Sequence, residues 1–325
     1  MLHKDRAYAS PATFYLNRAL RIYPAYWVMA GGTFALWLVS REKLHAFVGL
    51  NPSAAALLVV SNLILFGQDV VMFTQQTGHG IGFALDFTKT SPPLWKFLLI
   101  PPAWSLSLEL TFYALAPFIV RRVPVMLGLT AVSLVLTGIS WRHGLAADPW
   151  TYRFFPFELS LFLLGALSER LLLSRVPRES RWVKPAPVIV AVALLVYPFA
   201  PMVEPLRTVA VLALFAALLP ALFRCQHGRR WDILIGDLSY PLYIGHWLVV
   251  SVINKVWEKH QVWPDAVRGG LCLAGALVVA LLLERLVARP VEKLRRRVRQ
   301  ASAPVDTLEA VLPGALEPPV SPVAT

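Results

Sequence analysis

Apolar residues follow one another in long blocks along this chain. We place nine blocks at residues 22–39, 53–66, 104–120, 124–141, 154–173, 186–203, 206–223, 238–257 and 268–288. A helix needs about 20 mostly apolar residues to cross the hydrocarbon core of a bilayer. Soluble helices and strands of this length would instead alternate apolar and polar faces. The pattern therefore predicts an all-α, polytopic membrane helix bundle.

Lysine and arginine are concentrated in four connections between or after these blocks. The positions are Arg121 and Arg122; Arg170, Arg175, Arg178, Arg181 and Lys184; Arg224, Arg229 and Arg230; and Lys293, Arg295, Arg296, Arg297 and Arg299. Basic residues in short loops favour the cytoplasmic side of a membrane. We therefore expect the last seven blocks to be crossings. We also expect both termini to lie on the cytoplasmic side of the cell inner membrane.

The block at 53–66 differs from the others because it is short and contains Asn62. Apolar stretches of about 10–14 residues are more often re-entrant or interfacial than spanning. Arg18 precedes the first block and Trp104 begins the third, and opposite sides of the membrane are expected for them. We therefore predict about eight spanning helices plus one re-entrant or short helix. A further crossing within 67–103 is the alternative, which the polar residues of that segment disfavour.

Composition supports the membrane assignment and excludes other classes. Hydrophobic residues make up 57% of the 325 residues and charged residues 15%, against about 25% charged in soluble domains. The formal net charge of +12 comes from residues that flank apolar blocks, so we expect a lipid bilayer as partner and no nucleic acid. Cys225 and Cys272 are too few for a disulfide framework. No metal-ligand spacing, P-loop or dinucleotide motif is present, and we expect no metal and no bound cofactor.

The domain organisation follows from where the apolar blocks end. We predict one transmembrane domain at 1–299. The residues that follow, 300–325, are rich in proline and have no apolar stripe long enough to span. Such a composition cannot bury enough apolar surface to fold, so a disordered tail is expected there.

Ionisable residues at membrane depth are costly and are functional candidates for that reason. Glu109 lies one to two turns inside its block and is expected nearer the outer end of the span. It is either a structural carboxyl bonded to neighbouring helices or a group that orients an acceptor hydroxyl. Arg18 and Arg21 share one helix face at the inner mouth of the first block. Their spacing suits a grip on phosphate, and equally a simple cytoplasmic anchor.

His246 is the other ionisable candidate. The i, i+3 and i+4 spacing of Tyr243, His246 and Trp247 places them on one helix face. The histidine is either a hydrogen-bonded structural residue or a catalytic or ligand-binding one. Counted from the start of its block, it is expected nearer the inner end of the span. These residues alone do not separate an enzyme from a transporter.

Three segments, taken together, resemble the acyltransferase-3 family of membrane O-acyltransferases. They are residues 14–27 with the Arg-x-x-Arg pair, residues 104–117 with Trp-Ser-Leu-x-x-Glu, and residues 238–246 with Ser-Tyr-x-x-Tyr-x-x-His. The resemblance implies transfer of an acyl group, usually acetyl, from acyl-CoA to a hydroxyl of a sugar, polysaccharide or related acceptor. It implies that acyl-CoA is a co-substrate rather than a bound cofactor.

The resemblance also assigns roles to residues of this chain. It implies catalytic positions at Glu109 and His246 and a CoA-side role for Arg18 and Arg21. The further substrate-binding residues implied by the motifs are Trp104, Ser105, Tyr113, Tyr240 and Tyr243.

The chain departs from the family pattern at both ends. The family's first two helices, with the proposed catalytic histidine, are not found, so we expect an N-terminally truncated domain. Near the end, Ala288 stands where the family often has glutamate, and Glu284 lies one turn earlier. An inactive truncated paralogue, or a non-enzymatic membrane transporter or scaffold, is therefore the alternative to an active acyltransferase.

Overall fold

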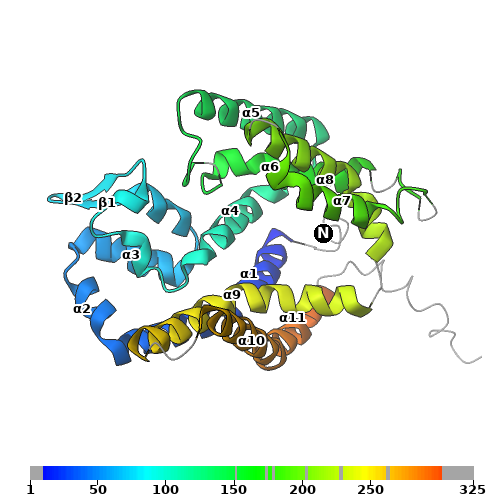
Figure 1. Cartoon of the computed structure of the whole chain (residues 1–325). Coiled ribbons are helices and arrows are strands. Elements are labelled where there is room, and N and C mark those ends of the chain that lie inside the picture. Colours follow the sequence, from blue (N-terminus) through cyan, green and yellow to red (C-terminus); the bar gives the residue numbers. More distant parts are fainter. Residues whose placement is uncertain are drawn as a thin grey trace, which may run out of the picture.

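The computed structural model describes residues 10–150, 152–172, 175–177, 180–201, 204–226, 230–260 and 264–301. The tail predicted at 300–325 lies outside these residues from 302 onward. Helices dominate the structure (Figure 1). Their bounds are α1 Pro11–Ser40, α2 Glu42–Val48, α3 Pro52–Ile64, α4 Trp104–Ile119, α5 Val123–Arg142, α6 Phe155–Leu167, α7 Ala186–Val196, α8 Glu204–Gln226, α9 Arg230–His260, α10 Asp265–Leu283 and α11 Arg289–Ala301.

Shorter elements join these helices. A β-hairpin pairs β1 (Thr74–Thr77) with β2 (Gly80–Phe83) in antiparallel register, Thr74 opposite Phe83. Short 3₁₀ helices lie at Gln68–Phe73, Phe87–Lys89, Leu94–Phe97, Pro101–Ala103 and Tyr197–Phe199, and π-helical turns at Ser168–Leu172 and Glu284–Ala288. The second π-helical turn connects α10 directly to α11.

The number of helices that can span a membrane is smaller than expected. Among the described residues, five stretches are long and apolar enough: Pro11–Ser40, Val123–Arg142, Leu206–Cys225, Asp232–Lys259 and Asp265–Val298. The all-α, multi-pass class is confirmed by these helices, whereas a count of about eight spans is not.

Three of the predicted spans form shorter helices. They are α4, α6 and α7, with 16, 13 and 11 residues. At 1.5 Å per residue these reach about 24, 20 and 17 Å, less than a hydrocarbon core of about 30 Å. The block at 154–173 passes into a π-helical turn with Glu169 and Arg170, and α7 passes into a 3₁₀ turn that contains Pro198.

Helices α1 and α9 lie side by side and run in the same direction. The Tyr240 hydroxyl donates to the carbonyl of Ile22 at 2.5 Å. Further along both helices, a Cβ atom on Gly245 would lie 3.9 Å from Cε of Met29. A Cβ atom on Gly32 would lie only 2.8 Å from Cδ2 of Leu248, so the missing side chain at Gly32 permits the close approach of the two helices, as small residues do between membrane helices.

Helix α4 runs antiparallel to α1. Tyr15, near the start of α1, donates to the carbonyl of Ala114, near the end of α4 (3.1 Å). The start of α4 instead meets the middle of α9, where Ser105 Oγ lies 2.7 Å from the hydroxyl of Tyr243. Because α1 and α4 are consecutive long elements of opposite direction, the segment 41–103 leaves and returns at the same end of the bundle. This agrees with a segment 53–66 that does not cross, which stays a prediction; at 13 residues, α3 is shorter than a span.

The short helix α3 and the chain after it pack against the middle of α1. Tyr26 donates its hydroxyl proton to the carbonyl of Asn62 at 2.8 Å. The Asn62 amide donates to the carbonyl of Phe97 (3.1 Å) and accepts from the N–H of Leu99 (2.8 Å). Asn62, which interrupts the apolar block in the sequence, thus satisfies backbone groups of the segment that leads to α4.

Asn62→Ala is expected to lower the free energy of unfolding by about 1–3 kcal/mol, because it leaves a buried N–H and a buried carbonyl without partners. Thermal unfolding of the purified protein in detergent measures this loss. The matched control is Asn254→Ala, at a half-buried position on α9. Equal unfolding temperatures for the two variants would contradict this role of Asn62.

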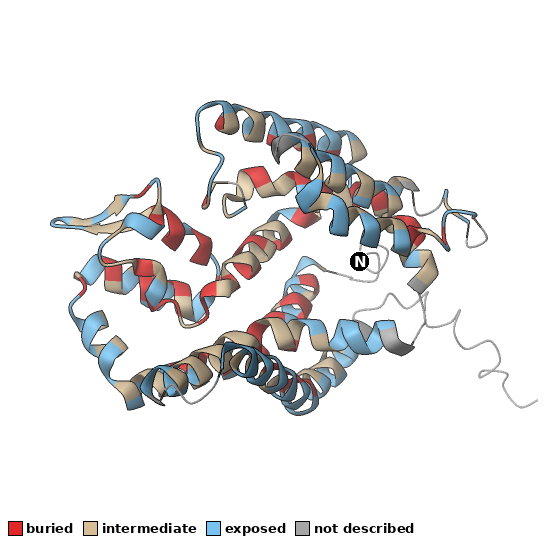
Figure 2. Cartoon of the chain, viewed as in Figure 1, coloured by how far each residue is buried: buried red, intermediate tan, exposed pale blue. Residues whose placement is uncertain are grey.

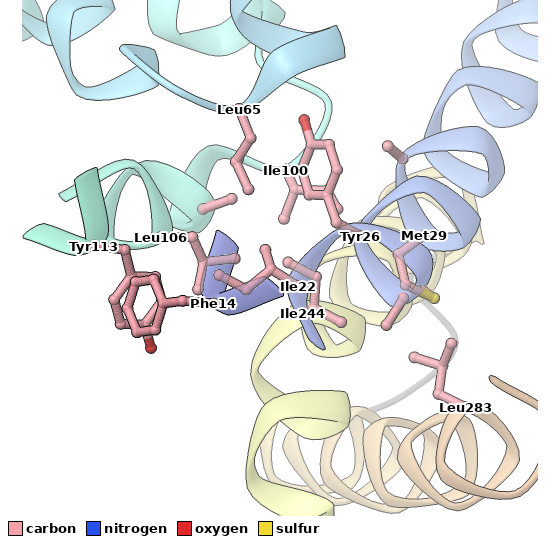
Figure 3. Packing of buried hydrophobic residues seen from close by; sticks show 13 residues of the cluster. Phe14, Ile22, Tyr26, Met29, Leu65, Ile100, Leu106, Tyr113, Ile244 and Leu283 are labelled. Carbon is pink, nitrogen blue, oxygen red and sulfur yellow. The ribbon is translucent and has the colours of Figure 1, made fainter. Parts of the chain in front are cut away.

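The central core joins α1, α4, α9 and α10. Its buried side chains include Phe14, Ile22, Tyr26, Met29, Leu65, Ile100, Leu106, Tyr113, Ile244 and Leu283 (Figure 3). Large apolar side chains are exposed on the outer faces of α5, α7, α8 and α10 (Figure 2). Such surfaces are unusual on soluble proteins and are suited to contact with lipid tails.

Helix α11 packs against the beginning of α1 and carries much of the positive charge there. Arg295 donates from Nε to the carbonyl and Oδ1 of Asn17 (3.2 and 2.9 Å) and from Nη1 to Glu292 (2.5 Å). Asn17 is buried. The start of α1, the end of α4 and α11 therefore lie together at one end of the bundle, here called the basic end.

Candidate active site

Arg18 and Arg21 lie inside α1 rather than at its mouth. The helix begins at Pro11, where Ser10 Oγ accepts the N–H of Thr13 at 3.2 Å, and not near the first apolar residue of the block. The capping serine and the proline at the first helical position explain the earlier start. Arg18 is therefore about two turns from the helix start. The helix therefore begins earlier than the apolar block, and the position of the pair at the inner mouth of the span stays a prediction.

Arg18 is buried between α1 and α4. The Cζ atom of its guanidinium lies 4.7 Å from the ring centroid of Tyr113 and 5.2 Å from that of Phe14. The two rings meet edge to face (Figure 3). A cation over aromatic faces is stabilised where water is excluded. The hydroxyl of Tyr113 donates in turn to Glu109, one helical turn along α4.

Glu109 is the carboxylate that lies among the tyrosines between α1, α4 and α9. Its carboxylate acts electrostatically on the hydroxyls of Tyr113, Tyr240 and Tyr243. Arg21 acts on the hydroxyls of Tyr113 and Tyr240 as well. Residues that are far apart in the three sequence motifs are thus neighbours between α1, α4 and α9.

Hydrogen bonds hold the tyrosines of α9 in place. The Tyr240 hydroxyl binds the carbonyl of Ile22, as described above. The Tyr243 hydroxyl donates to the carbonyl of Pro102 and lies within hydrogen-bonding distance of Ser105. Pro102 belongs to the 3₁₀ turn that leads into α4, so Tyr243 ties the start of α4 to the middle of α9.

His246 lies one helical turn beyond Tyr243. Its Nδ1 is 2.7 Å from the carbonyl oxygen of Tyr243. A carbonyl can only accept, so Nδ1 carries the proton, and in the neutral ring Nε2 has a free lone pair. This hydrogen bond fixes the orientation of the His246 ring, so that Nε2 points away from the α9 backbone.

The order of depth predicted for Glu109 and His246 is reversed. Helix α9 begins at Arg230 rather than near residue 238, and its course parallel to α1 places Tyr240 beside Ile22 and Gly245 beside Met29. His246 is therefore farther from the basic end than Glu109. Going from the basic end outward, the polar residues follow the order Arg18, Glu109, Tyr240, Tyr243 and His246, and we call this set the polar column.

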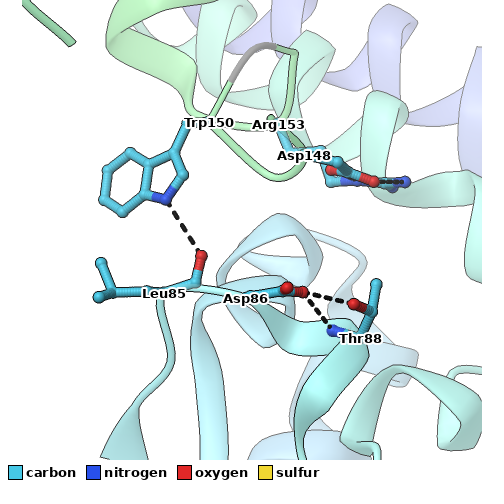
Figure 4. Close-up of polar contacts among 6 residues, drawn as sticks. All are labelled: Leu85, Asp86, Thr88, Asp148, Trp150 and Arg153. Atoms are coloured by element: carbon cyan, nitrogen blue, oxygen red, sulfur yellow. Dashed lines mark hydrogen bonds and ion pairs between the residues drawn. The ribbon is translucent and has the colours of Figure 1, made fainter. Parts of the chain in front are cut away.

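Trp104 meets a charged pair that the sequence analysis did not identify. The Arg153 guanidinium lies 4.5 Å from the ring centroid of Trp104 and donates to both carboxylate oxygens of Asp148, at 2.5 and 2.9 Å (Figure 4). The charge of Arg153 also acts on the Tyr243 hydroxyl. The chain before α6 thus supports the start of α4. Bidentate geometry depends on the folded loop and has no signature in the sequence.

Asp69 is a second residue that the sequence analysis did not identify as a candidate. It lies in the 3₁₀ helix after α3, is buried, and accepts the hydroxyl of Ser107 at 2.5 Å. Burial raises the pKa of the Asp69 carboxyl, and hydrogen bonds from Ser107 and from the backbone N–H groups of Asp69 and Val70 oppose this shift. A polar residue in a connecting segment gives no sequence signal that it will be buried against α4.

The raised pKa of Asp69 makes stability depend on pH. The folded protein binds this proton more tightly than the unfolded chain, so the stabilisation is complete below the unfolded value of about 3.9 and is lost as pH rises through the folded value. Asp69→Asn retains an acceptor for Ser107 without the charge. We expect it to unfold at a higher temperature than the wild type at about pH 7, with no difference near pH 4.

Asp86→Asn is the control for this measurement. Hydrogen bonds from Thr88 (Figure 4), and then from Lys89, lower the pKa of the Asp86 carboxyl. The stabilisation that Asp86 contributes therefore has the opposite pH dependence: it is present at neutral pH and lost as pH falls. An Asp69→Asn shift in unfolding temperature that does not vary between about pH 4 and 7 would contradict the expected titration.

The site contains arginine, carboxylate, tyrosine and imidazole groups along the inner faces of three helices. Within the part of the chain that the structure describes, no group of three or more histidine, cysteine, aspartate or glutamate residues could hold a metal ion. This fold defines a multi-pass membrane protein with a row of ionisable and hydroxyl groups between three of its helices.

The chain belongs to the acyltransferase-3 family, whose acyltransferase domain matches residues 1–285, and it is a membrane O-acyltransferase. It is 26% identical over 315 residues to the exopolysaccharide production protein ExoZ of Rhizobium meliloti, covering 92% of this chain and 86% of that protein. It is 28% identical over 299 residues to a putative membrane-bound transacylase, BcsY, of Komagataeibacter xylinus, covering 86% and 69%.

A third relative is the acyltransferase MdmB of Streptomyces mycarofaciens. The two are 27% identical over 242 residues, which is 62% of this chain and 61% of that protein. No solved structure matches the chain significantly. The family assignment is therefore based on sequence, and the resemblance seen in the three motifs is confirmed.

Proposed function

We propose that this protein transfers an acyl group, acetyl in the simplest case, from acyl-CoA to a hydroxyl of a carbohydrate or related acceptor. One observation carries the proposal: residues from three distant motifs, Arg18, Glu109, Tyr240 and Tyr243, lie close together between α1, α4 and α9, and His246 follows one helical turn beyond Tyr243. The name of ExoZ, an exopolysaccharide production protein, supports a saccharide acceptor. We further propose location in the inner membrane, with the basic end in the cytoplasm.

Arg18 and Arg21 are the groups proposed to bind the phosphates of CoA. Arginine suits this role because its planar fork can bind phosphate through two parallel hydrogen bonds. Both residues lie toward the basic end, where a donor from the cytoplasm would enter. Glu109 acts on the same tyrosines as Arg21, so it limits the positive charge that the site must hold when it is empty.

His246 is proposed to accept the proton of the acceptor hydroxyl at Nε2. Measured along α1, His246 lies about 16 Å outward of Arg18, by the rise of 1.5 Å per residue between positions 18 and 29. The pantetheine arm of CoA separates its thioester from its phosphates, so a donor held at Arg18 would extend toward His246.

The proposed step balances without any further reactant. The hydroxyl oxygen attacks the thioester carbonyl as its proton passes to Nε2, an ester bond forms, and the C–S bond breaks. The leaving CoA thiolate then takes the proton from the imidazolium. Tyr243 and Ser105, next to His246, are hydroxyl groups that could bind substrate oxygens as the acceptor approaches.

Acyl transfer is tested with the full chain in lipid nanodiscs. Radiolabelled acetyl-CoA is supplied with a mixture of bacterial exopolysaccharide fragments, and transfer of label to saccharide is measured alongside release of free CoA. Label on the saccharide supports the proposal. Binding of acetyl-CoA without label transfer or CoA release would favour the alternative of an inactive paralogue.

A further inference from the structure

An open pocket of about 490 Å³ lies between the β1–β2 hairpin and the start of α6, away from the basic end. Aromatic side chains form much of its wall, and a carboxylate and a hydroxyl complete it. The residues that matter to its chemistry are Asp69, Phe73, Thr74, Phe83, Trp150 and Phe154. The proposed donor site does not use this pocket.

The indole of Trp150 is held in a fixed orientation in this wall. Its ring centroid lies 5.1 Å from that of Phe73 and 5.5 Å from that of Phe154. Its Nε1 donates to the carbonyl of Leu85 at 3.1 Å (Figure 4). Phe83, on β2, lies 6.1 Å from Trp150 and is 60% exposed. The wall therefore offers rigid aromatic surface together with one ring that a ligand could cover.

Asp69 gives the pocket a polar group that an apolar ligand could not satisfy. An ionised carboxylate has about four acceptor positions, and Ser107 with the backbone N–H groups of Asp69 and Val70 occupy part of them. A lipid chain has no donor to offer the remainder, and burying a carboxylate against it would be costly. A ligand with hydroxyl groups on an otherwise apolar ring matches both kinds of surface.

The pocket and the polar column adjoin the same helix, α4, on different faces. Ser107, which donates to Asp69, is two residues from Glu109 and two from Ser105, the partner of Tyr243, and residues two apart on a helix point to different faces. The pocket lies level with the first turns of α4, toward the end of the bundle at which His246 is found. This is the end opposite the proposed entry of acyl-CoA.

We propose that this pocket binds a pyranose ring of a carbohydrate, stacked on the Trp150–Phe83 wall with a hydroxyl donated to Asp69. That the bound carbohydrate is the acyl acceptor rests on the proposed function. Aromatic faces stack on the C–H face of a sugar ring as they do on other flat apolar groups. Pockets of this kind combine apolar walls with a few polar groups that fix orientation.

Saccharide binding to the full chain in nanodiscs tests the pocket without acyl-CoA. Cellohexaose and maltohexaose serve as probes, and saturation-transfer NMR with titration gives the dissociation constants. Phe83→Ala should weaken binding of the better probe about tenfold, the loss of one aromatic stacking contact. Leu85→Ala is the matched control, because Leu85 is 61% exposed on the same segment and does not line the pocket.

Asp69→Asn provides a second, independent variant. It should also weaken saccharide binding, while thermal unfolding shows that the fold is retained. If neither hexasaccharide binds to the wild type, the proposal is overturned, and a lipid becomes the expected occupant of the pocket. Equal dissociation constants for the wild type and the Phe83→Ala variant would overturn it as well.

The binding and transfer experiments distinguish an error in the pocket proposal from an error in the proposed acyl-transfer function. Saccharide binding that depends on Phe83, without label transfer from acetyl-CoA, would contradict the acyl-transfer proposal and support the saccharide pocket. Label transfer with the same saccharide KM in the wild type and in the Phe83→Ala variant would support acyl transfer and contradict saccharide binding in this pocket.

Discussion

His246→Gln should lower kcat for acyl transfer by about 10²- to 10⁴-fold, the range that a positioned general base contributes. Glutamine retains a polar group near the carbonyl of Tyr243 but has no nitrogen that can take a proton at neutral pH. The KM for acetyl-CoA should change little, because Arg18 lies about 16 Å away along α1. Steady-state kinetics in nanodiscs, with both substrates varied, separate these two effects.

His45→Gln is the control for this variant, since His45 is exposed on α2 at the end of the bundle opposite the basic end. It should leave kcat unchanged. A His246→Gln protein with normal kcat would show that the histidine only caps its own helix turn through Tyr243. The proton would then have to pass to a different group.

Arg18→Ala should raise the KM for acetyl-CoA by about 10- to 150-fold, equivalent to one hydrogen bond between charged groups of about 1.5–3 kcal/mol. The KM of the Arg18→Lys variant for acetyl-CoA should lie between those of the Arg18→Ala variant and the wild type. Lysine keeps the charge but loses the planar fork and the stacking on Tyr113 and Phe14. Titration with labelled acetyl-CoA measures the affinity directly.

Arg142→Ala, at an exposed position at the end of α5, is the matched control and should bind acetyl-CoA normally. Thermal unfolding of each variant tests whether a loss of affinity reflects a loss of fold. Unchanged acetyl-CoA affinity in a folded Arg18→Ala protein would exclude Arg18 from the donor site and leave it as a structural cation between α1 and α4.

The chemistry and the transmembrane direction proposed here are linked by the order of residues in the polar column. The arginines proposed to bind the donor lie toward the basic end, His246 lies farther from that end, and the aromatic pocket lies near the start of α4. A protein that receives acyl-CoA on one side and a saccharide on the other needs this order. Because His246 lies farther from the basic end than Glu109, the order of the residues is consistent with the proposed direction of transfer.

Much of the site could be predicted from the sequence because ionisable residues in apolar segments are rare. Glu109 and His246 stand out for this reason, Arg18 stands out through its Arg-x-x-Arg spacing with Arg21, and the motifs around them indicate the family. Asp69 and Arg153 could not be found in the same way. They lie in polar connections, where charged residues are common, and their burial or pairing depends on contacts with α4.

The amino-acid sequence was enough to determine the helical membrane class and the family motifs, because hydrophobicity and local spacing are encoded over a few helical turns. The tertiary structure alone decided helix lengths, the depth of Arg18 and His246, and the pocket beside Asp69. These features depend on capping, helix direction and packing between segments more than 30 residues apart, such as Ser105 with Tyr243. No local pattern records such contacts.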